Sequence, residues 1–250
     1  MATVSIITVC FNSETTISRT IESVLNQTIE KLEYIIIDGA SKDKTVEIAK
    51  SYEKAFAEKG YDYRIYSEPD KGIYDAMNKG IKKATGELIG IINSSDWYEP
   101  SAVKTAVSYY GATRYDLFYA DLQIWDEDKE GNLSKKLVKK ARIRDLVVSR
   151  DWNHPTTFVP KHVYEALNYF KLESIHDDWD LILRIRKNNP RMVIANEVLA
   201  NFTMGGVSNE KSIKKCISRG KARYRIYRNN GYSRFYWFEC VLIEAVKYIL

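Results

Sequence analysis

The stretch VSIITVCFN, residues Val4 to Asn12, decides the fold because it joins an apolar strand directly to a polar turn. Its first part, Val4 to Val9, is short, β-branched and almost wholly apolar, and Glu33 to Asp38 (EYIIID) has the same character. Such runs are typical of parallel strands covered on both faces. Apolar residues at helical spacing occupy Glu14 to Gln27 between them, so the chain is predicted to open with a β-α-β unit.

The same alternation continues through the first hundred residues. The further predicted elements are a helix at Thr45–Phe56, a strand at Tyr63–Ser67, a helix carrying Ile73, Met77, Ile81 and Ala84, a strand at Glu87–Asn93, and a helix opened by Pro100. Four β-then-α units in a row predict an α/β fold with a doubly wound parallel sheet and right-handed crossovers.

Beyond Tyr110 the pattern changes. Predicted there are a hairpin of Asp116–Trp125 and Leu133–Val138 around Gly131-Asn132, helices near His162–Tyr169 and Asp178–Lys187, and a strand at Arg191–Leu199. No Gly/Ser/Pro-rich linker separates the halves. We therefore expect one domain, residues 1–210, made of halves 1–100 and 101–210, followed by a helical extension at 211–250.

The composition fits a globular protein: 250 residues with 45% hydrophobic residues can bury a substantial core. Three cysteines far apart, Cys10, Cys216 and Cys240, indicate neither a disulfide framework nor a zinc site, and favour a reducing, cytoplasmic setting. The N-terminus lacks the basic region of a signal peptide. We also expect no membrane span, because no apolar stretch approaches the roughly 20 residues that one needs.

Polar residues collect after the predicted parallel strands, where ligands bind in open α/β sheets. This rim would carry Phe11, Asp38, Lys71 and Asp96. The chain has neither GxGxxG nor GxxxxGK[ST], which argues against hydride transfer with NAD and against P-loop hydrolysis. An aromatic ring can flank a nucleobase, one carboxylate can accept hydrogen bonds from a base or ribose, and another can hold a divalent cation.

Each of these residues also has a purely structural interpretation. A strand-ending Asp often serves as a turn or N-cap residue. Phe11 could belong to the core, and Lys71 could be a solvated surface charge. Their joint placement at strand ends favours a binding site.

Five segments together resemble the family 2 glycosyltransferases of GT-A fold, especially bacterial enzymes of cell-surface polysaccharide synthesis. The segments are SIITVCFNSE, ESVLNQT, EYIIIDGASKDKT, SEPDKGIYDAMNKGI and ATGELIGIINSSDWY. The resemblance implies transfer of a sugar from a nucleotide-sugar, usually a UDP-sugar, with Mg²⁺ or Mn²⁺ on the diphosphate and inversion at the anomeric carbon. Residues 1–100 would bind the donor and residues 101–210 the acceptor.

By the same resemblance, Val9 and Phe11 line the nucleobase, Asp38 contacts it, and Lys71 is a basic contact to the donor. Asp96 matches the metal-binding last acid of the DxD-type motif. Ser95 stands where relatives commonly carry an acid that contacts ribose; a serine keeps one hydrogen bond but brings no charge. Metal affinity should then depend more on Asp96, the diphosphate oxygens and water.

The segment SIHDDWDLILRI, Ser174 to Ile185, resembles the acidic motif that supplies the family's catalytic base, which is Asp178 here. An inverting displacement needs a carboxylate that takes the proton of the acceptor hydroxyl, and a helix N-terminus keeps such an acid ionised. The alternative is that Asp177, Asp178 and Asp180 only cap the helix. We also expect Arg184 to pair with Asp180 at i,i+4 spacing.

Two histidines have open roles. His154, in NHPTTF, lies where relatives carry a short motif near the acceptor, so it would contact sugar or phosphate, or serve as a hydrogen-bonded structural residue. His176 lies two residues before Asp178 and would reach the metal in one interpretation.

The tail is basic and aromatic. From Lys211 to Arg234 it holds nine Lys/Arg and no Asp/Glu, although the net charge of the whole chain is only +5. One hypothesis is a surface helix pair on anionic lipid at the inner face of the cell membrane, near a polyprenyl-diphosphate-linked acceptor. The alternative is a packed helix with a solvated basic face. A nucleic-acid partner is not expected, because the rest of the chain is net acidic and has no such motif.

The sequence therefore predicts a metal-dependent inverting glycosyltransferase that moves a hexose or N-acetylhexosamine from a nucleotide-sugar to a glycan or lipid-linked glycan. One alternative is a sugar nucleotidyltransferase, although its usual glycine- and arginine-rich first loop is absent. The other is a non-catalytic nucleotide-sugar-binding or membrane-associated protein, which the serine at position 95 favours.

Overall fold

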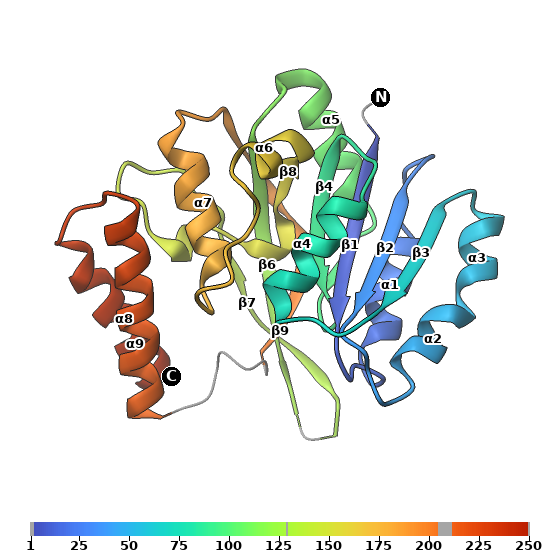
Figure 1. Cartoon of the computed structure of the whole chain (residues 1–250), viewed down its shortest axis with the longest axis horizontal. Helices are drawn as coiled ribbons and strands as arrows, with labels where there is room; N and C mark the ends of the chain where they lie inside the picture. The colour runs from blue at the N-terminus through green and yellow to red at the C-terminus, as the bar shows by residue number, and fades with distance from the viewer. Residues whose placement is uncertain (1–2, 129, 205–211, 250) are drawn as a thin grey trace.

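The computed structural model describes residues 3–128, 130–204 and 212–249 and confirms the predicted α/β class, with a mixed sheet between two layers of helices (Figure 1). Within these residues the strands follow the order β3-β2-β1-β4-β8-β6-β9-β5, and β7 pairs with β6. The strands are β1 (Val4–Cys10), β2 (Glu33–Asp38), β3 (Asp62–Ser67), β4 (Leu88–Asn93), β5 (Trp97–Tyr98), β6 (Leu117–Glu127), β7 (Leu133–Lys139), β8 (Phe158–Pro160) and β9 (Met192–Met204).

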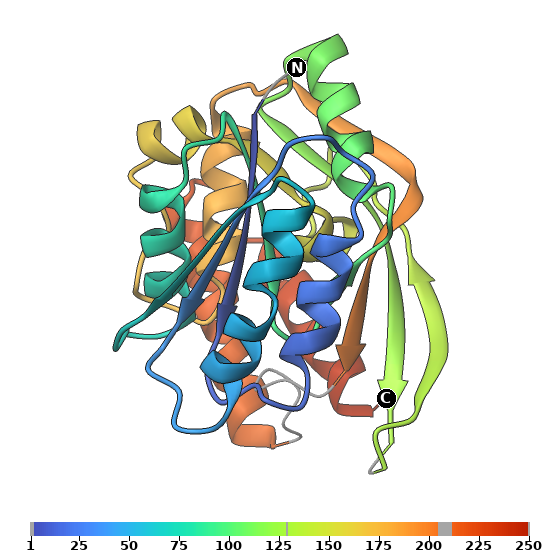
Figure 2. The ribbon, with the colours of Figure 1, turned by 90° about the vertical axis from the view of Figure 1, so that its right-hand side faces the viewer.

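Helices lie against both faces of this sheet, and α8 and α9 lie at one end of the molecule (Figure 1). The helices of the described residues are α1 (Ile17–Leu25), α2 (Thr45–Ser51), α3 (Glu53–Glu58), α4 (Ile73–Lys83), α5 (Ala102–Thr113), α6 (Lys161–Ala166), α7 (Asp177–Lys187), α8 (Ile213–Asn229) and α9 (Tyr236–Ile249), with short 3₁₀ turns η1 (Ser149–Asp151) and η2 (His154–Thr156). Figure 2 shows α4 on one side of the parallel strands and α1 on the other.

The parallel half of the sheet, β1 to β4, matches the prediction. Its central strands are buried on both faces, and its edge strand pairs with a buried strand. β1 and β2 are buried along their whole length, and β1 pairs in parallel with both β2 and β4. β3 pairs in parallel with β2 and forms the edge of the sheet, where its residues are only partly buried. The expected alternation of strand and helix thus produces the expected parallel sheet.

The second half is mixed. β6 and β7 form the predicted antiparallel pair. The strand predicted at Arg191–Leu199 extends to Met204 as β9, which runs parallel to β6 and antiparallel to β5. The very short strands β5 and β8 were not predicted, because runs of two or three residues carry no periodic signal.

Two helices differ from the prediction. The single helix expected at Thr45–Phe56 is broken at Tyr52, whose amide bonds to the carbonyl of Ala49, three residues back, at 3.3 Å. A bond three residues back tightens the last turn of α2. The helix expected at Glu14–Gln27 begins only at Ile17, because residues 11–16 form the turn that leaves β1.

Two apolar clusters hold the layers together. One cluster lies between the sheet and α1, α3 and α5. The other joins the opposite face of the sheet to α4, to α7 and to residues of α8 and α9. Tyr227 of α8 belongs to the second cluster, and its ring meets Trp179 of α7 with centroids 6.0 Å apart. The C-terminal helices are therefore packed on the body of the protein through α7.

The two helices of the tail, α8 and α9, confirm the expectation that the C-terminal segment is helical. They pack against each other at the end of the molecule farthest from α2 and α3 (Figure 1). None of the helices in the described residues combines the length and the apolarity needed to cross a membrane.

Gly90 of β4 offers a test of the packing beneath the site. A Cβ at this position would lie 2.7 Å from a ring carbon of Phe158 and 2.9 Å from Ile6. Gly90→Ala should lower the free energy of unfolding by about 1–3 kcal/mol, the usual cost of an overpacked core. Urea denaturation of the purified chain measures this.

The matched control is Gly111→Ala on α5, where no atom lies within 4 Å of the added Cβ. There alanine should stabilise the protein by about 0.5–1 kcal/mol, since glycine weakens a helix interior. Equal effects of the two substitutions would contradict the packing described for β4.

Candidate active site

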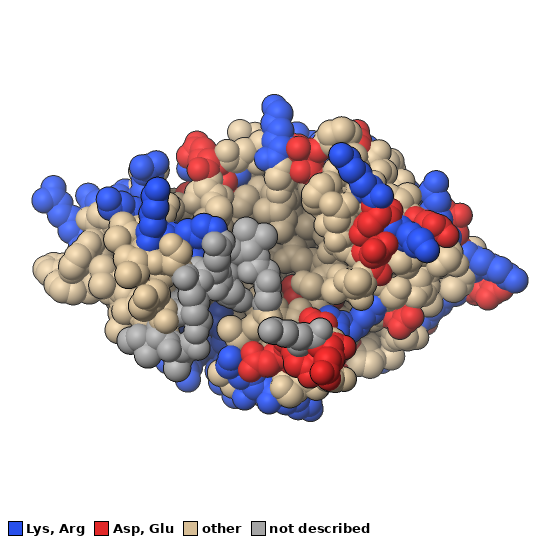
Figure 3. All heavy atoms as spheres, turned by 90° about the horizontal axis from the view of Figure 1, so that it is seen from below, with Lys and Arg blue, Asp and Glu red and all other residues tan. Residues whose placement is uncertain are grey.

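The carboxyl ends of the parallel strands meet at one edge of the sheet, as predicted. In the pairing register, Cys10 lies beside Asp38, Asp38 beside Ser67, and Val9 beside Asn93. Each loop that leaves these strands therefore emerges on the same rim. Figure 3 looks onto this edge and shows a hollow near its centre.

The loops after β1 and β2 hold each other in place. The amide of Asn12 donates to Ser41 Oγ at 2.8 Å, and Asn12 Oδ1 accepts from the amide of Lys42 at 2.9 Å. Both loops contain a non-glycine residue in the left-handed region, Asn12 at φ 48° and Ala40 at φ 63°. Such conformations persist only where surrounding contacts fix them, and they are frequent at ligand-binding sites.

Asp38 is fully buried, and its carboxylate organises the second loop. It accepts hydrogen bonds from the Ser41 amide at 2.9 Å, from Ser67 Oγ at 2.6 Å, and from the hydroxyl of Ser41. Cys10 Sγ lies 3.7 Å away. This geometry is that of a turn-forming aspartate, so contact with a nucleobase, which stays a prediction, would have to add to or replace these bonds.

The aromatic residue at the rim is exposed. Phe11 has 59% of its surface accessible, against 4% for Val9 below it in β1. The ring is thus available to a flat ligand, and its interpretation as a core residue is wrong. A Cβ on Gly39 would lie 2.5 Å from Asp70 Oδ2 and 3.4 Å from the Phe11 ring, so Asp70, to which the sequence assigned no role, also borders this surface.

Lys71 follows Asp70 and is exposed, with its amide bonded to Asp75 Oδ2 at 3.0 Å. The loop that carries it leads directly into α4. The predicted contact of Lys71 with a donor stays a prediction.

Asp96 lies in a different environment from Asp38. It is fully buried, and neither carboxylate oxygen has a hydrogen-bond partner among the described residues. Burial raises the pKa of Asp96 to about 7, although the Thr203 backbone and the charge of Arg19 act in the opposite direction. A buried carboxylate without partners is costly unless a cation compensates it.

This carboxylate fits a divalent cation only in part. Oxygen ligands suit Mg²⁺ and Mn²⁺, but the described residues contain no cluster of three or more His, Cys, Asp or Glu side chains that could hold a metal ion. Further ligands would therefore have to come from the diphosphate of a donor and from water. Because Asp96 is buried, neighbouring side chains must also move before an ion can reach it.

Arg19 of α1 is the neighbour that the sequence did not identify. Its Nη2 donates to the carbonyl of Ser95 at 3.1 Å, and its guanidinium lies over the Trp97 ring, 4.3 Å from the centroid. Ser94, one residue before Ser95, shares a hydrogen bond of 2.8 Å with Ser13 in the first rim loop. The NSSD turn is thus held between the start of α1 and the end of β1.

The second half contributes α7, whose first turn carries three aspartates with three different roles. Asp177 accepts hydrogen bonds from the amides of Glu173 and Ser174, at 2.8 and 3.1 Å, and closes the loop before the helix. His176 is the N-cap residue of α7. Its expected contact with a metal stays a prediction. Asp177 therefore fixes the preceding loop and does not cap α7, which has no side-chain cap hydrogen bond.

Asp178 faces the donor half. Its Oδ1 accepts hydrogen bonds from Tyr74 Oη at 3.0 Å and from the Trp179 amide at 2.7 Å. Tyr74 belongs to α4, three residues beyond Lys71, so this bond brings the acid of the second half to the rim of the first. Tyr74 was not predicted as a site residue, although it lies within the segment SEPDKGIYDAMNKGI.

His154 and Asp178 line the same small cavity, beside Ile91 of β4. Its volume of about 10 Å³ holds at most one water molecule, so a sugar would bind over these residues rather than inside the cavity. Burial lowers the pKa of His154, while the negative charge of Asp178 opposes the shift. His154 Nε2 is buried and without a hydrogen-bond partner in the described part of the chain.

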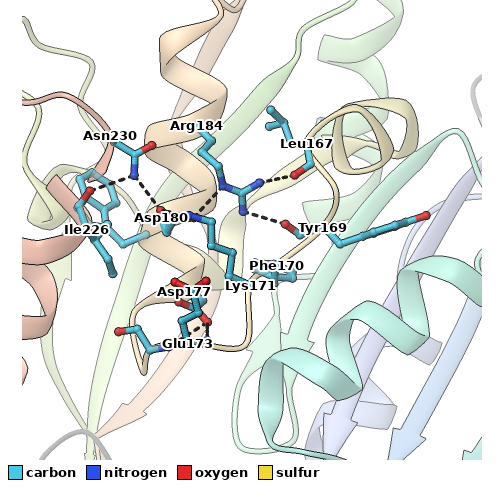
Figure 4. A network of polar contacts seen from close by, with 12 residues as sticks. Leu167, Tyr169, Phe170, Lys171, Glu173, Asp177, Asp180, Arg184, Ile226 and Asn230 are labelled. Atoms are coloured by element: carbon cyan, nitrogen blue, oxygen red, sulfur yellow. Dashed lines mark hydrogen bonds and ion pairs between the residues drawn. The ribbon is translucent and has the colours of Figure 1, made fainter. Parts of the chain in front are cut away.

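Asp180 fixes the orientation of α7 (Figure 4). It pairs with Arg184 Nε at 2.7 Å, as the i,i+4 spacing predicted, and accepts from Asn230 Nδ2 at 2.8 Å. The Arg184 guanidinium also donates to the carbonyls of Leu167 and Tyr169. One buried carboxylate thus connects α7 to the loop before it and to the end of α8.

Together these features define an α/β protein with polar and aromatic side chains at its parallel strand ends and a carboxylate of the second half, Asp178, bonded to Tyr74 of the first. The chain belongs to glycosyl transferase family 2, whose family model matches residues 5–179. The resemblance found in the sequence is therefore confirmed.

Individual relatives agree with this membership. An uncharacterized glycosyltransferase of Mycobacterium tuberculosis is 41% identical over 107 residues, 42% of this chain and 38% of the relative. EpsH of Bacillus subtilis is 36% identical over 97 residues, but the match spans only 27% of that protein. A PGL/p-HBAD biosynthesis glycosyltransferase of Mycobacterium bovis is 26% identical over 221 residues, 86% of this chain and 82% of the relative.

Solved structures share the fold at low identity. Staphylococcus aureus TarS, in complex with UDP-GlcNAc, has a TM-score of 0.66 and 16% identity over 99% of this chain and 72% of that one. The mannosyltransferase PcManGT of Pyrobaculum calidifontis, in complex with GDP-Man and Mn²⁺, has a TM-score of 0.68 and 15% identity over 100% of this chain and 70% of that one. The GT-A fold is therefore shown.

The buried His154 gives the site a pH-dependent stability. Because its pKa is lowered on folding, the unfolded chain takes up the proton first as the pH falls below about 6.5, and stability is lost with a slope of at most about 1.4 kcal/mol per pH unit. His154→Gln should reduce that slope between pH 7 and pH 5, measured by urea denaturation at intervals of pH.

The matched control is His162→Gln at an exposed position of α6. If both substitutions changed the slope equally, His154 could not be the buried group responsible.

Proposed function

We propose that this protein is an inverting glycosyltransferase that moves a hexose or N-acetylhexosamine from a nucleotide-sugar to a glycan acceptor. The observation that carries the proposal is the hydrogen bond between Asp178 and Tyr74, because it holds an acid of the second half against the rim that family members use for the donor. Family membership supports the donor class.

The proposed reaction is a single displacement. The acceptor oxygen forms a bond to the anomeric carbon, the bond from that carbon to the diphosphate oxygen breaks, and its electron pair leaves with the nucleoside diphosphate. Asp178 takes the proton of the acceptor hydroxyl, and the Trp179 amide and Tyr74 hydroxyl stabilise its anionic form beforehand. A covalent glycosyl-enzyme is not needed, since one carboxylate and one displacement suffice.

Asp96 is the proposed protein ligand of Mg²⁺ or Mn²⁺, and the ion would neutralise charge on the departing diphosphate. The buried carboxylate of Asp96, which has no hydrogen-bond partner among the described residues, supports this role. Phe11 and Val9 would border the base, Asp38 would contact it, and Lys71 and Ser95 would contact the rest of the donor. His154 and His176 would lie toward the acceptor or the metal.

The donor is most simply a UDP-sugar, as for the TarS complex, whereas PcManGT was solved with a GDP-sugar. The proposed acceptor is a glycan or a polyprenyl-diphosphate-linked glycan of surface polysaccharide synthesis, met in the cytoplasm at the inner face of the membrane. Family membership argues against a sugar nucleotidyltransferase. Measured transfer of sugar to an acceptor distinguishes the proposed enzyme from a non-catalytic protein that only binds nucleotide-sugars.

Asp178→Asn tests the base. The substitution keeps the shape and the hydrogen bond from Tyr74 but cannot accept the proton, so kcat should fall by about 100-fold or more, the usual contribution of general base catalysis. Donor affinity, measured by calorimetry with UDP, should stay within about twofold, because Asp178 is not proposed to bind the donor.

Glu173→Gln is the matched control, since it removes an exposed carboxylate from the loop just before the same helix. Its turnover should equal that of the unmodified chain. Full turnover in Asp178→Asn would show that another group is the base.

A thermal-shift screen of nucleotide-sugars with and without Mn²⁺ tests the donor and the metal together. A ligand at 100 times its Kd stabilises the native state by about 2.7 kcal/mol, so the correct donor should raise Tm, and more so with Mn²⁺. Asp96→Ala should lose the part of the Tm increase that depends on Mn²⁺ and should abolish transfer. Ser95→Asp should preserve or strengthen the binding of donor and metal. Retained transfer in Asp96→Ala would mean that the NSSD segment is only a turn.

A further inference from the structure

The outward surface of α9 is apolar. Six residues of the helix are each between 45% and 65% exposed: Trp237, Phe238, Val241, Leu242, Val246 and Tyr248. Pairs of them recur every four residues, which places them along one side of the helix. Phe235 just before the helix is 79% exposed. These residues, here called the α9 apolar face, make up an exposed surface much larger than scattered apolar residues would give.

The acidic and basic side chains of α8 and α9 differ in exposure. Residues 212–248 contain only two acids, and both face the protein. Glu244 is 5% exposed and pairs with Arg219 at 2.9 Å and with Arg223 at 3.4 Å; Glu239 keeps Oε1 buried.

The exposed charges of this segment are all positive. They belong to Lys214, Lys215, Lys221, Arg225, Arg228 and Arg234. In Figure 3 the end of the molecule that holds α8 and α9 accordingly shows several Lys and Arg beside uncharged residues. The described part of this segment thus combines an apolar helix face with a surface on which the exposed side chains that carry charge are Lys and Arg.

We propose that α8 and α9 form a docking surface for an anionic lipid bilayer, with the α9 apolar face in the interfacial layer and the exposed cations of α8 against lipid phosphates. Trp, Phe and Tyr suit this layer because they combine an apolar body with a polarisable or polar edge. Lysine and arginine add attraction to an anionic leaflet. Since none of the described helices can cross a membrane, the pair lies along the surface.

Charge complementarity distinguishes this occupant from a second copy of the chain. A symmetric dimer through the α9 apolar face would bring two cationic surfaces together, with both acids of each segment turned away from the contact. An anionic bilayer supplies the charge that this surface lacks. The inference goes beyond the proposed transferase function, because lipid binding requires no reaction.

The attachment would also orient the candidate site. Asn230 after α8 bonds to Asp180 of α7, and the Tyr227 hydroxyl donates to the carbonyl of Val147 at 3.0 Å. The bilayer-facing helices are thus joined directly to the helix that carries Asp178. A lipid-linked acceptor would be met by a site held at a fixed orientation to the membrane.

Co-sedimentation of the full chain with vesicles tests the docking surface. Phosphatidylcholine vesicles that contain about one-third phosphatidylglycerol should bind it, pure phosphatidylcholine vesicles should bind it at least about tenfold more weakly, and added salt should reduce the difference. Lys214→Glu combined with Lys221→Glu should weaken binding to the anionic vesicles by about tenfold or more, since each cation near the surface contributes about a fivefold effect.

Trp237→Ser combined with Phe238→Ser should remove the binding that persists at high salt, because that part comes from the α9 apolar face. Lys104→Glu on α5, and Leu137→Ser combined with Val138→Ser on β7, are matched controls at exposed positions outside the tail and should bind as the unmodified chain does. Circular dichroism confirms that each variant is folded.

Two results would overturn the proposal. One is equal binding, or none, to the neutral and the anionic vesicles. The other is a dimer in solution that the Trp237/Phe238 double variant dissociates, since a second copy would then cover the face. Neither result depends on transfer, so failure of lipid binding is distinguishable from failure of the proposed activity.

Discussion

The parallel pairing of β1 with β2 and β4 is the constraint on which the rest of the structure depends. β1 is buried on both faces, and its register sets where each of the following loops leaves the sheet. A slip of one residue would turn every side chain of the strand to the opposite face, against a different layer of helices. This register brings Asn12 within hydrogen-bonding distance of Ser41 and Lys42. It also brings Ser13 within hydrogen-bonding distance of Ser94.

Three buried aspartates show how the same residue type serves different purposes. Asp38 and Asp180 are surrounded by donors, so their charges are compensated inside the protein. Neither carboxylate oxygen of Asp96 has a hydrogen-bond partner among the described residues, and burial raises the pKa of Asp96 to about 7. Because native proteins rarely leave buried polar groups unpaired, the exception at the strand ends is informative about function.

The sequence predicted what depends on local pattern. Continuous apolar runs identified β1, β2 and β4, and the i,i+4 spacing identified the pair of Asp180 and Arg184. It could not predict contacts between distant segments, such as those of Arg19 with Ser95 or Tyr74 with Asp178, because no local periodicity encodes them. Phe11 shows a further limit: a residue type that is usually buried lies exposed at a rim, and only the tertiary structure decides between the two.

The bond between Asn230 and Asp180 has a consequence for how this chain can vary. A terminal extension joined only by exposed contacts can be exchanged between relatives as an independent module. Here its removal would leave a buried carboxylate with one partner fewer and expose the ring of Trp179 that packs on Tyr227. The last helices and the helix of the candidate base must therefore change together, so a relative with a different C-terminus should also carry a compensating change on α7.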